Sequence, residues 1–211
     1  MIIDNFKFKT RPETTDEAIV RNVFVEDEYD ARNLIKPQDV VVDIGAHIGS
    51  FSVLAASLGA QVSSYEPFFE SYNLLCQNME NNISTQTYTC IDKAVMGKRQ
   101  SRKLHVRQIN FGGNNFYQEP NTNENIECIT LDDVFKDNQI DHVDFLKLDC
   151  EGSEFEIIEH SDKLPLIKII AFEYVGDERR AEMLNLLKDY EILKDKHNDR
   201  FGTVVVRRKL K

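Results

Sequence analysis

Acidic residues recur where the predicted strands of this chain end. Asp43 lies in the apolar run VVVDI, Glu66 follows QVSSY, and Asp149 follows VDFLKL. Ligands of open, mainly parallel sheets bind beyond the carboxyl ends of the strands, so these side chains are expected at one edge. Gathered carboxylates repel one another unless a cation or hydrogen-bond donors offset their charge. The pattern therefore predicts a binding site there. The acids expected at this edge are Asp43, Glu66, Asp92, Asp149, Glu151 and Glu173.

The turn DIGAHIG carries two glycines, Gly45 and Gly49, four residues apart. It lacks the G-x-G-x-x-G spacing of a pyrophosphate-binding turn, and Asp43 would repel an anion. Glu66 lies about twenty residues further on, where an acid accepts hydrogen bonds from ribose hydroxyls. These features predict a nucleoside with a cationic end, such as S-adenosylmethionine. The alternatives are a tight strand–helix junction for the glycines and a surface position for Glu66.

Alternating strands and helices would bring these residues together. Apolar runs predict buried strands, and apolar residues at helical spacing predict helices between them. The order predicts an α/β fold with a seven-stranded, mostly parallel sheet and right-handed crossovers. The last two strands are close in sequence and should form an antiparallel hairpin. The predicted sheet strands are Val40–Ile44, Gln61–Tyr65, Thr87–Val95, Val143–Asp149, Lys168–Tyr174, Tyr190–Lys196 and Thr203–Arg208. The predicted helices are Glu28–Ile35, Gly49–Leu58, Phe68–Met79, Leu131–Phe135, Glu154–His160 and Asp177–Leu187.

Two regions lie outside this regular pattern. Residues 1–36 are predicted to form an N-terminal cap segment, with a short strand at Asn22–Val25, before a main domain at 37–211. Residues 97–127 hold a possible hairpin strand at Lys103–Arg107 and a Gly- and Asn-rich loop. Long loops in compact domains are often functional, so this insertion is expected to cover an acceptor pocket. Its side chains expected to contact a sugar, or to form a flexible lid, are Asn114, Asn115, Tyr117, Phe111 and Phe116.

Composition excludes several classes of protein. The formal net charge of -10 argues against a broad nucleic-acid surface, and the basic stretch Arg207–Lys211 is interpreted as a solvated tail. No apolar run approaches the length of a membrane span, and the first residues carry charges too early for a signal peptide. The four cysteines are widely spaced, which favours a reducing compartment. A cytoplasmic protein is expected.

Four segments together resemble the FkbM family of S-adenosylmethionine-dependent O-methyltransferases. They are VVVDIGAHIGSFS, YEPFFESYNLLCQNM, LDDV and DFLKLDCEGSEFEII, and the resemblance extends from about Arg11 to the C-terminus. It implies a Rossmann-like class I methyltransferase fold. It also implies methyl transfer to a hydroxyl of a small molecule or glycan, with a sugar favoured over a non-sugar natural product. The chain could also be one domain of a larger glycan-modifying enzyme.

The resemblance also implies roles for individual residues. The DIGAHIG loop would lie against the methionine part of the cofactor, with His47 where the family often has asparagine, so that its role stays open. Glu66 would bind the ribose, and the residues after it and around Asp92 would lie near the adenine. The implied cofactor-binding set is Asp43, Gly45, Ala46, His47, Gly49, Glu66, Pro67, Phe68, Asp92, Lys93, Ala94 and Asp149. The implied catalytic set is Lys147, Asp149, Glu151 and Glu173.

Methyl transfer from a sulfonium is an in-line displacement in which the acceptor hydroxyl must lose one proton. One carboxylate among Asp149, Glu151 and Glu173 could act as the base. Alternatively, Asp149 and Glu173 could hold Mg²⁺. A third interpretation is a buried pair between Lys147 and Glu151 that only shapes the loop. Strand alternation would place Lys147, Asp149 and Glu151 on one face. His105 and His142 are weaker candidates for the base, and Arg11 and Asp16 of the N-terminal segment are weaker candidates for contacts to the acceptor.

Two other functions stay open on the sequence alone. One is a binding or scaffold module that retains a cofactor pocket without catalysis. The other is a nicotinamide-dependent oxidoreductase, which the wide spacing of Gly45 and Gly49 disfavours.

Overall fold

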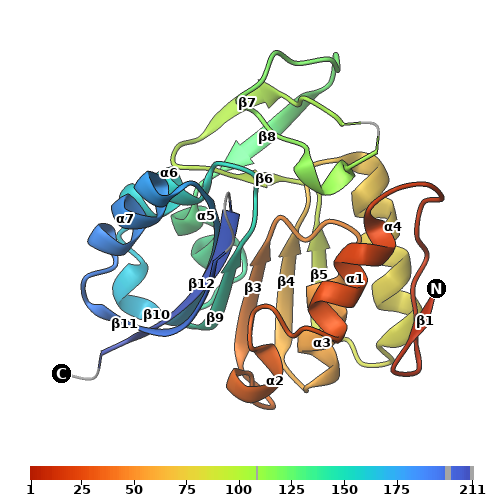
Figure 1. Cartoon of the computed structure of the whole chain (residues 1–211), viewed down its shortest axis with the longest axis horizontal. Helices are drawn as coiled ribbons and strands as arrows, with labels where there is room; N and C mark the ends of the chain where they lie inside the picture. Colours follow the sequence, from red (N-terminus) through yellow and green to blue (C-terminus); the bar gives the residue numbers. More distant parts are fainter. Residues whose placement is uncertain (108, 198–200, 210–211) are drawn as a thin grey trace.

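The centre of the molecule is a seven-stranded sheet, shown in Figure 1 from a computed structural model that describes residues 1–107, 109–197 and 201–209. In sheet order, its strands are β11 (Tyr190–His197), β12 (Phe201–Arg208), β10 (Ile167–Val175), β9 (Val143–Leu148), β3 (Val40–Ile44), β4 (Gln61–Tyr65) and β5 (Tyr88–Ile91). Strands β10, β9, β3, β4 and β5 run parallel, whereas β12 is antiparallel to both of its neighbours. The predicted α/β fold with a C-terminal antiparallel hairpin is therefore confirmed.

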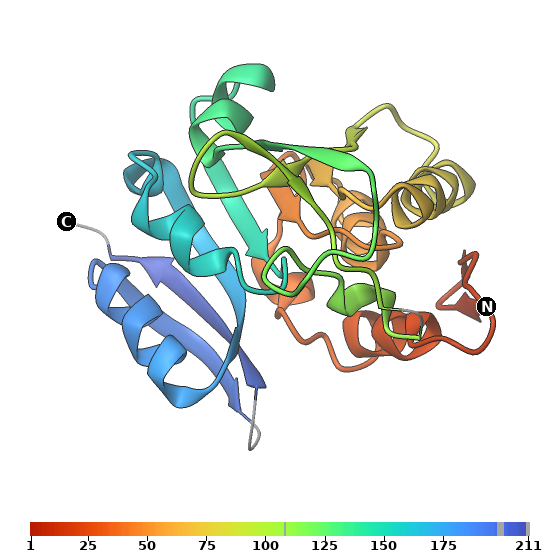
Figure 2. The ribbon, with the colours of Figure 1, turned by 90° about the horizontal axis from the view of Figure 1, so that it is seen from above.

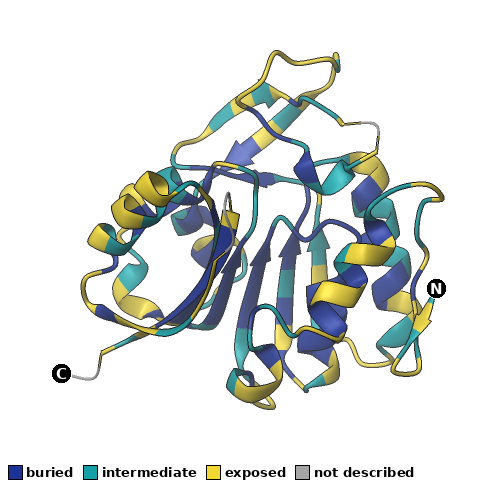
Figure 3. Cartoon of the chain, in the orientation of Figure 1, coloured by how far each residue is buried: buried dark blue, intermediate teal, exposed yellow. Residues whose placement is uncertain are grey.

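Helices cover both faces of the sheet. They are α1 (Asp16–Phe24), α2 (Ala31–Leu34), α3 (Ser50–Ser57), α4 (Phe69–Asn82), α5 (Leu131–Asp137), α6 (Glu154–Glu159) and α7 (Asp177–Leu186). Successive strand residues face opposite cores: Val41 packs with side chains of α1, α3 and α4, and Val42 with those of α5, α6 and α7. Both faces are therefore apolar, which explains the uninterrupted apolar strands in the sequence. Figure 3 shows the strands buried between the two helical layers.

The N-terminal segment packs against the sheet domain. It begins with a small hairpin of β1 (Ile2–Ile3) and β2 (Phe6–Lys7) and continues into α1. The strand predicted at Asn22–Val25 is wrong, because α1 extends to Phe24 and Val25 is its C-cap. Val20, Val23 and Phe24 are all buried, and their i, i+3, i+4 spacing places them on one helical face.

The insertion is more ordered than the loop predicted for it. The strand expected at Thr87–Val95 is broken, and its second part, β6 (Ala94–Val95), joins a separate three-stranded sheet of order β6-β8-β7. The other strands are β7 (Gln100–Lys103), which begins earlier than the predicted Lys103–Arg107, and β8 (Asn125–Ile129), which was not predicted. Figure 1 shows this small sheet lying across the carboxyl ends of β3, β4 and β5.

The insertion meets the N-terminal segment above the sheet. A short 3₁₀ turn, η1 (Phe111–Gly113), lies beside α1 in Figure 2. The Thr15 amide donates to the carbonyl of Ile109 at 3.3 Å, and its hydroxyl donates to Asn110 Oδ1 at 3.0 Å. The two segments therefore form one continuous roof over the edge where the strands end.

Three further features concern the start of α5, the basic stretch near the C-terminus and the length of the helices. Thr130 caps α5, and Asp133 completes its capping box. In the stretch Arg207–Lys211, Arg207 belongs to β12 and pairs with Glu191, while residues 210–211 lie outside the described part. None of the helices in the described ranges is long and apolar enough to cross a membrane.

Candidate active site

A cavity of about 360 Å³ lies at the edge where the parallel strands end. Its walls come from the ends of β3, β4, β9 and β10, and the N-terminal segment and the insertion close it above. This volume lies within the range of small-molecule sites. The predicted cofactor-binding and catalytic residues that line it are Gly45, His47, Glu66, Pro67, Lys93, Ala94, Asp149, Glu151 and Glu173. Phe111, Asn114 and Phe116, which were expected to contact the acceptor, line this cavity as well and do not line the second one. The predicted residues that are not part of its lining are Asp43, Ala46, Gly49, Phe68, Asp92 and Lys147.

The glycine turn brings two strands into close contact. Gly45 has a φ of +79°, and a Cβ on it would lie 1.8 Å from the carbonyl oxygen of Asp149. No side chain fits there, so the turn after β3 can rest directly on the segment after β9. His47 also has a left-handed φ, +52°, which is uncommon for a residue other than glycine. The turn is therefore shaped by contact with the Asp149 segment.

Glu66 is held in a fixed orientation by this turn. Its Oε2 accepts from the amide of His47, and its Oε1 accepts from the amide of Phe68, both at 2.9 Å. The side chain is buried, and burial raises its pKa above the ordinary value. Each carboxylate oxygen keeps a further lone pair, so Glu66 can still accept hydrogen bonds from two hydroxyls of a ligand.

Asp43 and Lys147 form a buried pair beneath the cavity. Lys147 Nζ lies 2.9 Å from Asp43 Oδ1 and donates to the carbonyl oxygen of Gly45 at 2.9 Å. The hydroxyl of Ser52 donates to the other Asp43 oxygen at 2.6 Å. Burial alone would lower the pKa of Lys147, but Asp43 and Asp149 raise it above its ordinary value. The interpretation that Lys147 pairs with Glu151 is wrong: its partner is Asp43, and the pair fixes the turn from below.

Asp149 remains an anion at the cavity wall. It accepts a 2.8 Å hydrogen bond from the hydroxyl of Tyr29, and Lys147 Nζ lies 3.6 Å away. Burial alone would raise its pKa, but Lys147, Glu173 and Tyr29 together lower it. Burial and the neighbouring Asp149 raise the pKa of Glu173 to about 10. Glu173 is therefore protonated near neutral pH, and this proton lets the two carboxyl groups lie together.

Glu151 occupies a different position from the one predicted by strand alternation. Strand β9 ends at Leu148, and Glu151 has a left-handed φ of +57°, so it does not continue the face of Lys147. Burial, with a contribution from Asp149, raises its pKa to about 7. Together with Glu173, it also lines a second cavity of about 470 Å³ between the insertion and α7. Glu151 therefore lies where two cavities meet.

The structure gives no support to the predicted magnesium site at Asp149 and Glu173. Within the described ranges, no group of three or more histidine, cysteine, aspartate or glutamate side chains could hold a metal ion. His105 and His142 lie outside both cavities. The first contacts the carbonyl of Glu119, and the second is exposed beside Asp141.

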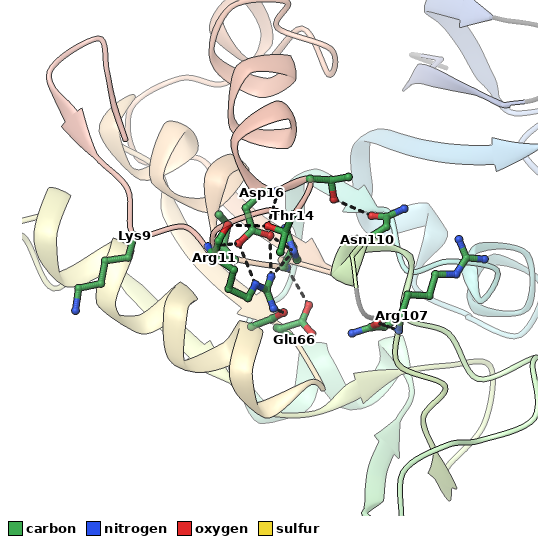
Figure 4. Close-up of polar contacts among 12 residues, drawn as sticks. Lys9, Arg11, Thr14, Asp16, Glu66, Arg107 and Asn110 are labelled. Atoms are coloured by element: carbon green, nitrogen blue, oxygen red, sulfur yellow. Dashed lines mark hydrogen bonds and ion pairs between the residues drawn. The ribbon is translucent and has the colours of Figure 1, made fainter.

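Several site residues were missed or underrated on the sequence. Tyr29 and Glu28 line the cavity, but they were predicted only as the start of the helix Glu28–Ile35, so no local pattern marks them as site residues. Arg11 and Asp16 form a buried ion pair at 2.9 Å that contacts His47. Figure 4 shows this pair next to Glu66. The only signal in the sequence was the pair of opposite charges itself, and Asp16 proves to be the first residue of α1.

The free protein is expected to lose stability as pH rises through about 7. Burial and Asp149 raise the pKa of Glu28, like that of Glu151, from 4.5 to about 7. The folded state therefore binds more protons than the unfolded state between these values. The contribution of these two groups to the free energy of unfolding is fully present below about pH 4.5 and is lost as the pH rises through about 7. Thermal melts from about pH 5 to pH 8 should show a falling Tm.

A matched pair of variants checks this pH dependence. Glu28→Gln should flatten the profile, whereas Glu119→Gln, at an exposed position of the insertion, should leave it parallel to wild type. Equal slopes for all three proteins would contradict the assignment to Glu28.

Comparisons with known proteins show which family this chain resembles. A family model described as the methyltransferase FkbM domain matches residues 43–192. Methyltransferase sdnD of Sordaria araneosa is 22% identical over 231 residues, covering 90% of this chain and 89% of the relative. The 31-O-demethyl-FK506 methyltransferase FkbM of Streptomyces tacrolimicus is 24% identical over 207 residues, covering 82% and 80%.

A solved structure shows the same fold. Trm5 of Methanocaldococcus jannaschii, in complex with adenosine, matches with a TM-score of 0.54 and 13% identity. The match covers 99% of this chain and 52% of that protein, so the chain spans about half of its length. At this identity, the likeness concerns the fold alone.

Proposed function

This chain belongs to the FkbM methyltransferase family and has the class I methyltransferase fold, and from this premise we propose that it methylates a hydroxyl oxygen, with S-adenosylmethionine as donor. The observation that carries the proposal is the position of Glu151. It is a carboxylate with a pKa of about 7, placed where a cofactor-sized cavity meets a second one. A hydroxyl that enters from the second cavity would find a base beside the methyl donor.

The residues of the first cavity suit S-adenosylmethionine. This cofactor supplies a methyl group already activated by the positive charge of its sulfonium. Asp149 stays ionised and can balance that charge, while Glu66 offers lone pairs to ribose hydroxyls. A pyrophosphate finds no glycine-rich cradle beside Glu66, which argues against a dinucleotide.

Residues of this chain would have separate roles in the reaction: one removes the proton and others orient Asp149. Glu151 takes the proton of the acceptor hydroxyl as its oxygen attacks. Tyr29 and Lys147 hold Asp149 in place through the contacts described above. The roof formed by the insertion and the N-terminal segment limits access of water to the first cavity.

The second cavity is the proposed acceptor site. It is lined by exposed and polar groups of the insertion, among them Tyr117 and Gln118, and by Tyr174 and Val175 from the end of β10. Aromatic faces beside polar side chains suit a sugar or glycan, which is the favoured acceptor; a non-sugar natural product is the alternative. Asn115 is less suited than expected, because its side chain bonds within the loop to Gly113, Tyr117 and Gln118.

The function can be tested in two steps. Calorimetric titration should show binding of both S-adenosylmethionine and S-adenosylhomocysteine; folded protein that binds neither would refute the proposal. Acceptor screening by mass spectrometry should then reveal a product heavier by one methylene unit, located on oxygen by fragmentation. Methylation on nitrogen or carbon would overturn the hydroxyl assignment. Tight binding with no turnover on any acceptor would favour the scaffold module.

A further inference from the structure

The imidazole of His47 is clamped on one side by the N-terminal segment. Arg11 Nη2 lies 2.8 Å from His47 Nε2 and 2.9 Å from Asp16 Oδ1. Arg11 Nε donates to the other Asp16 oxygen at 2.9 Å, and Nη1 donates to Ser71 at 3.1 Å. Figure 4 shows the Arg11–Asp16 pair at the centre of this network. Arg11 and Asp16 both precede residue 43, where the match to the family model begins.

This contact determines which ring nitrogen of His47 carries the proton. Asp16 Oδ1 also lies near Nε2, at 3.3 Å, but the Arg11 guanidinium is nearer, at 2.8 Å, and it only donates hydrogen bonds. The shorter contact therefore assigns a free lone pair to Nε2. The two hydrogens of Arg11 Nη2 are then used fully, one toward Asp16 and one toward His47. In an imidazolium, the Nε2–H of His47 would point at an N–H group of Arg11, and neither group could accept a hydrogen bond. The neutral ring therefore has its hydrogen on Nδ1.

That Nδ1–H has no partner within the described part of the protein. The nitrogen is buried, and His47 is one of the residues that line the first cavity. A buried donor without an acceptor is destabilising, so such an atom suggests that a ligand completes its hydrogen bonding. The backbone amide of the same residue already orients Glu66.

We propose that His47 Nδ1–H donates to a ribose hydroxyl of the bound nucleoside, and that Arg11 and Asp16 are positioning residues that hold the ring in this tautomer. A hydroxyl both donates and accepts. Glu66 can only accept, and His47 in this tautomer can only donate into the cavity, so together they satisfy a hydroxyl. The inference rests on the proposed function, because it assumes a nucleoside in the first cavity.

The tautomer can be measured on the unaltered protein. Nitrogen NMR of the five histidines, with His47 assigned by comparison with His47→Asn, should show a protonated Nδ1 and an unprotonated Nε2. Arg11→Lys keeps a positive charge beside Asp16 but removes the planar fork, and should lose this fixed state. A protonated Nε2 in the wild type would overturn the inference whatever the variants do.

Ligand titration tests the hydrogen bond itself. His47→Asn keeps a donor at the Nδ1 position and suits a left-handed φ, so its affinity for S-adenosylhomocysteine should stay within about threefold of wild type. His47→Leu removes the donor and should weaken binding about tenfold or more. Equal affinities of the two variants would overturn the proposal, and melting curves show whether each is folded.

A second ligand identifies the accepting group. 5′-Methylthioadenosine has the ribose but no carboxylate, and His47→Leu should weaken its binding by the same factor. A loss confined to S-adenosylhomocysteine would place the donor on the carboxylate and overturn the ribose assignment. Failure of the wild type to bind either nucleoside would instead refute the proposed function.

Discussion

Glu66→Ala is expected to weaken binding of S-adenosylhomocysteine by about 10²- to 10⁴-fold. The estimate follows from the loss of two hydrogen bonds to a buried carboxylate, each contributing about 1.5–3 kcal/mol. The orientation of Glu66 supports the upper half of this range, because two backbone amides already fix both of its oxygens. Isothermal titration calorimetry measures the change directly.

The substitution also leaves the amides of His47 and Phe68 without their acceptor, so folding must be checked separately. Glu70→Ala is the matched control, since Glu70 is an exposed acid in the first turn of α4. It should bind like wild type. If Glu66→Ala is folded and keeps its affinity within about threefold, Glu66 does not hold the ribose.

The sheet and the ribose acid could be predicted because their signals are local. Strands β3, β9, β10 and β12 are buried on both faces, and their apolar runs are visible without any knowledge of their neighbours. Glu66 is marked by its distance from Gly45 along one strand–helix–strand unit. The error at Asn22–Val25 is also local: valine and phenylalanine suggest a strand, but the burial of Val20 and Phe24 follows a helical period.

The remaining parts of the site depend on contacts between distant segments. Tyr29 bonds to Asp149, 120 residues later, and Lys147 bonds to Asp43, 104 residues earlier. Neither pairing leaves a trace in local spacing. The sequence also suggested that Glu151 continues the strand, whereas the chain turns after Leu148 to bring the Asp149 carbonyl against Gly45. Close packing of two backbones decided the position of the proposed base.

Glu151 is the carboxylate whose chemistry best fits proton removal at neutral pH. A general base works best when its pKa lies near the working pH, and burial with Asp149 brings Glu151 to about 7. Asp149 has a lowered pKa and is already engaged by Tyr29, so it is a weak base. Glu173, with a pKa of about 10, already holds a proton. The left-handed backbone of Glu151 is also the kind of strain that collects at functional sites.

Glu151→Gln should therefore lower kcat by about 10²- to 10⁴-fold while S-adenosylhomocysteine still binds with wild-type affinity. In the wild type, kcat/KM should rise with pH through about 7, because only the deprotonated carboxylate accepts a proton, and this limb should vanish in the variant. Asp149→Asn separates the competing assignment. It should weaken cofactor binding and keep the pH limb, which should move to lower pH because the Asp149 charge no longer raises the pKa of Glu151. If Glu151→Gln keeps its turnover and Asp149→Asn loses both turnover and limb with binding intact, the base is Asp149, and the pKa match of Glu151 has no catalytic meaning.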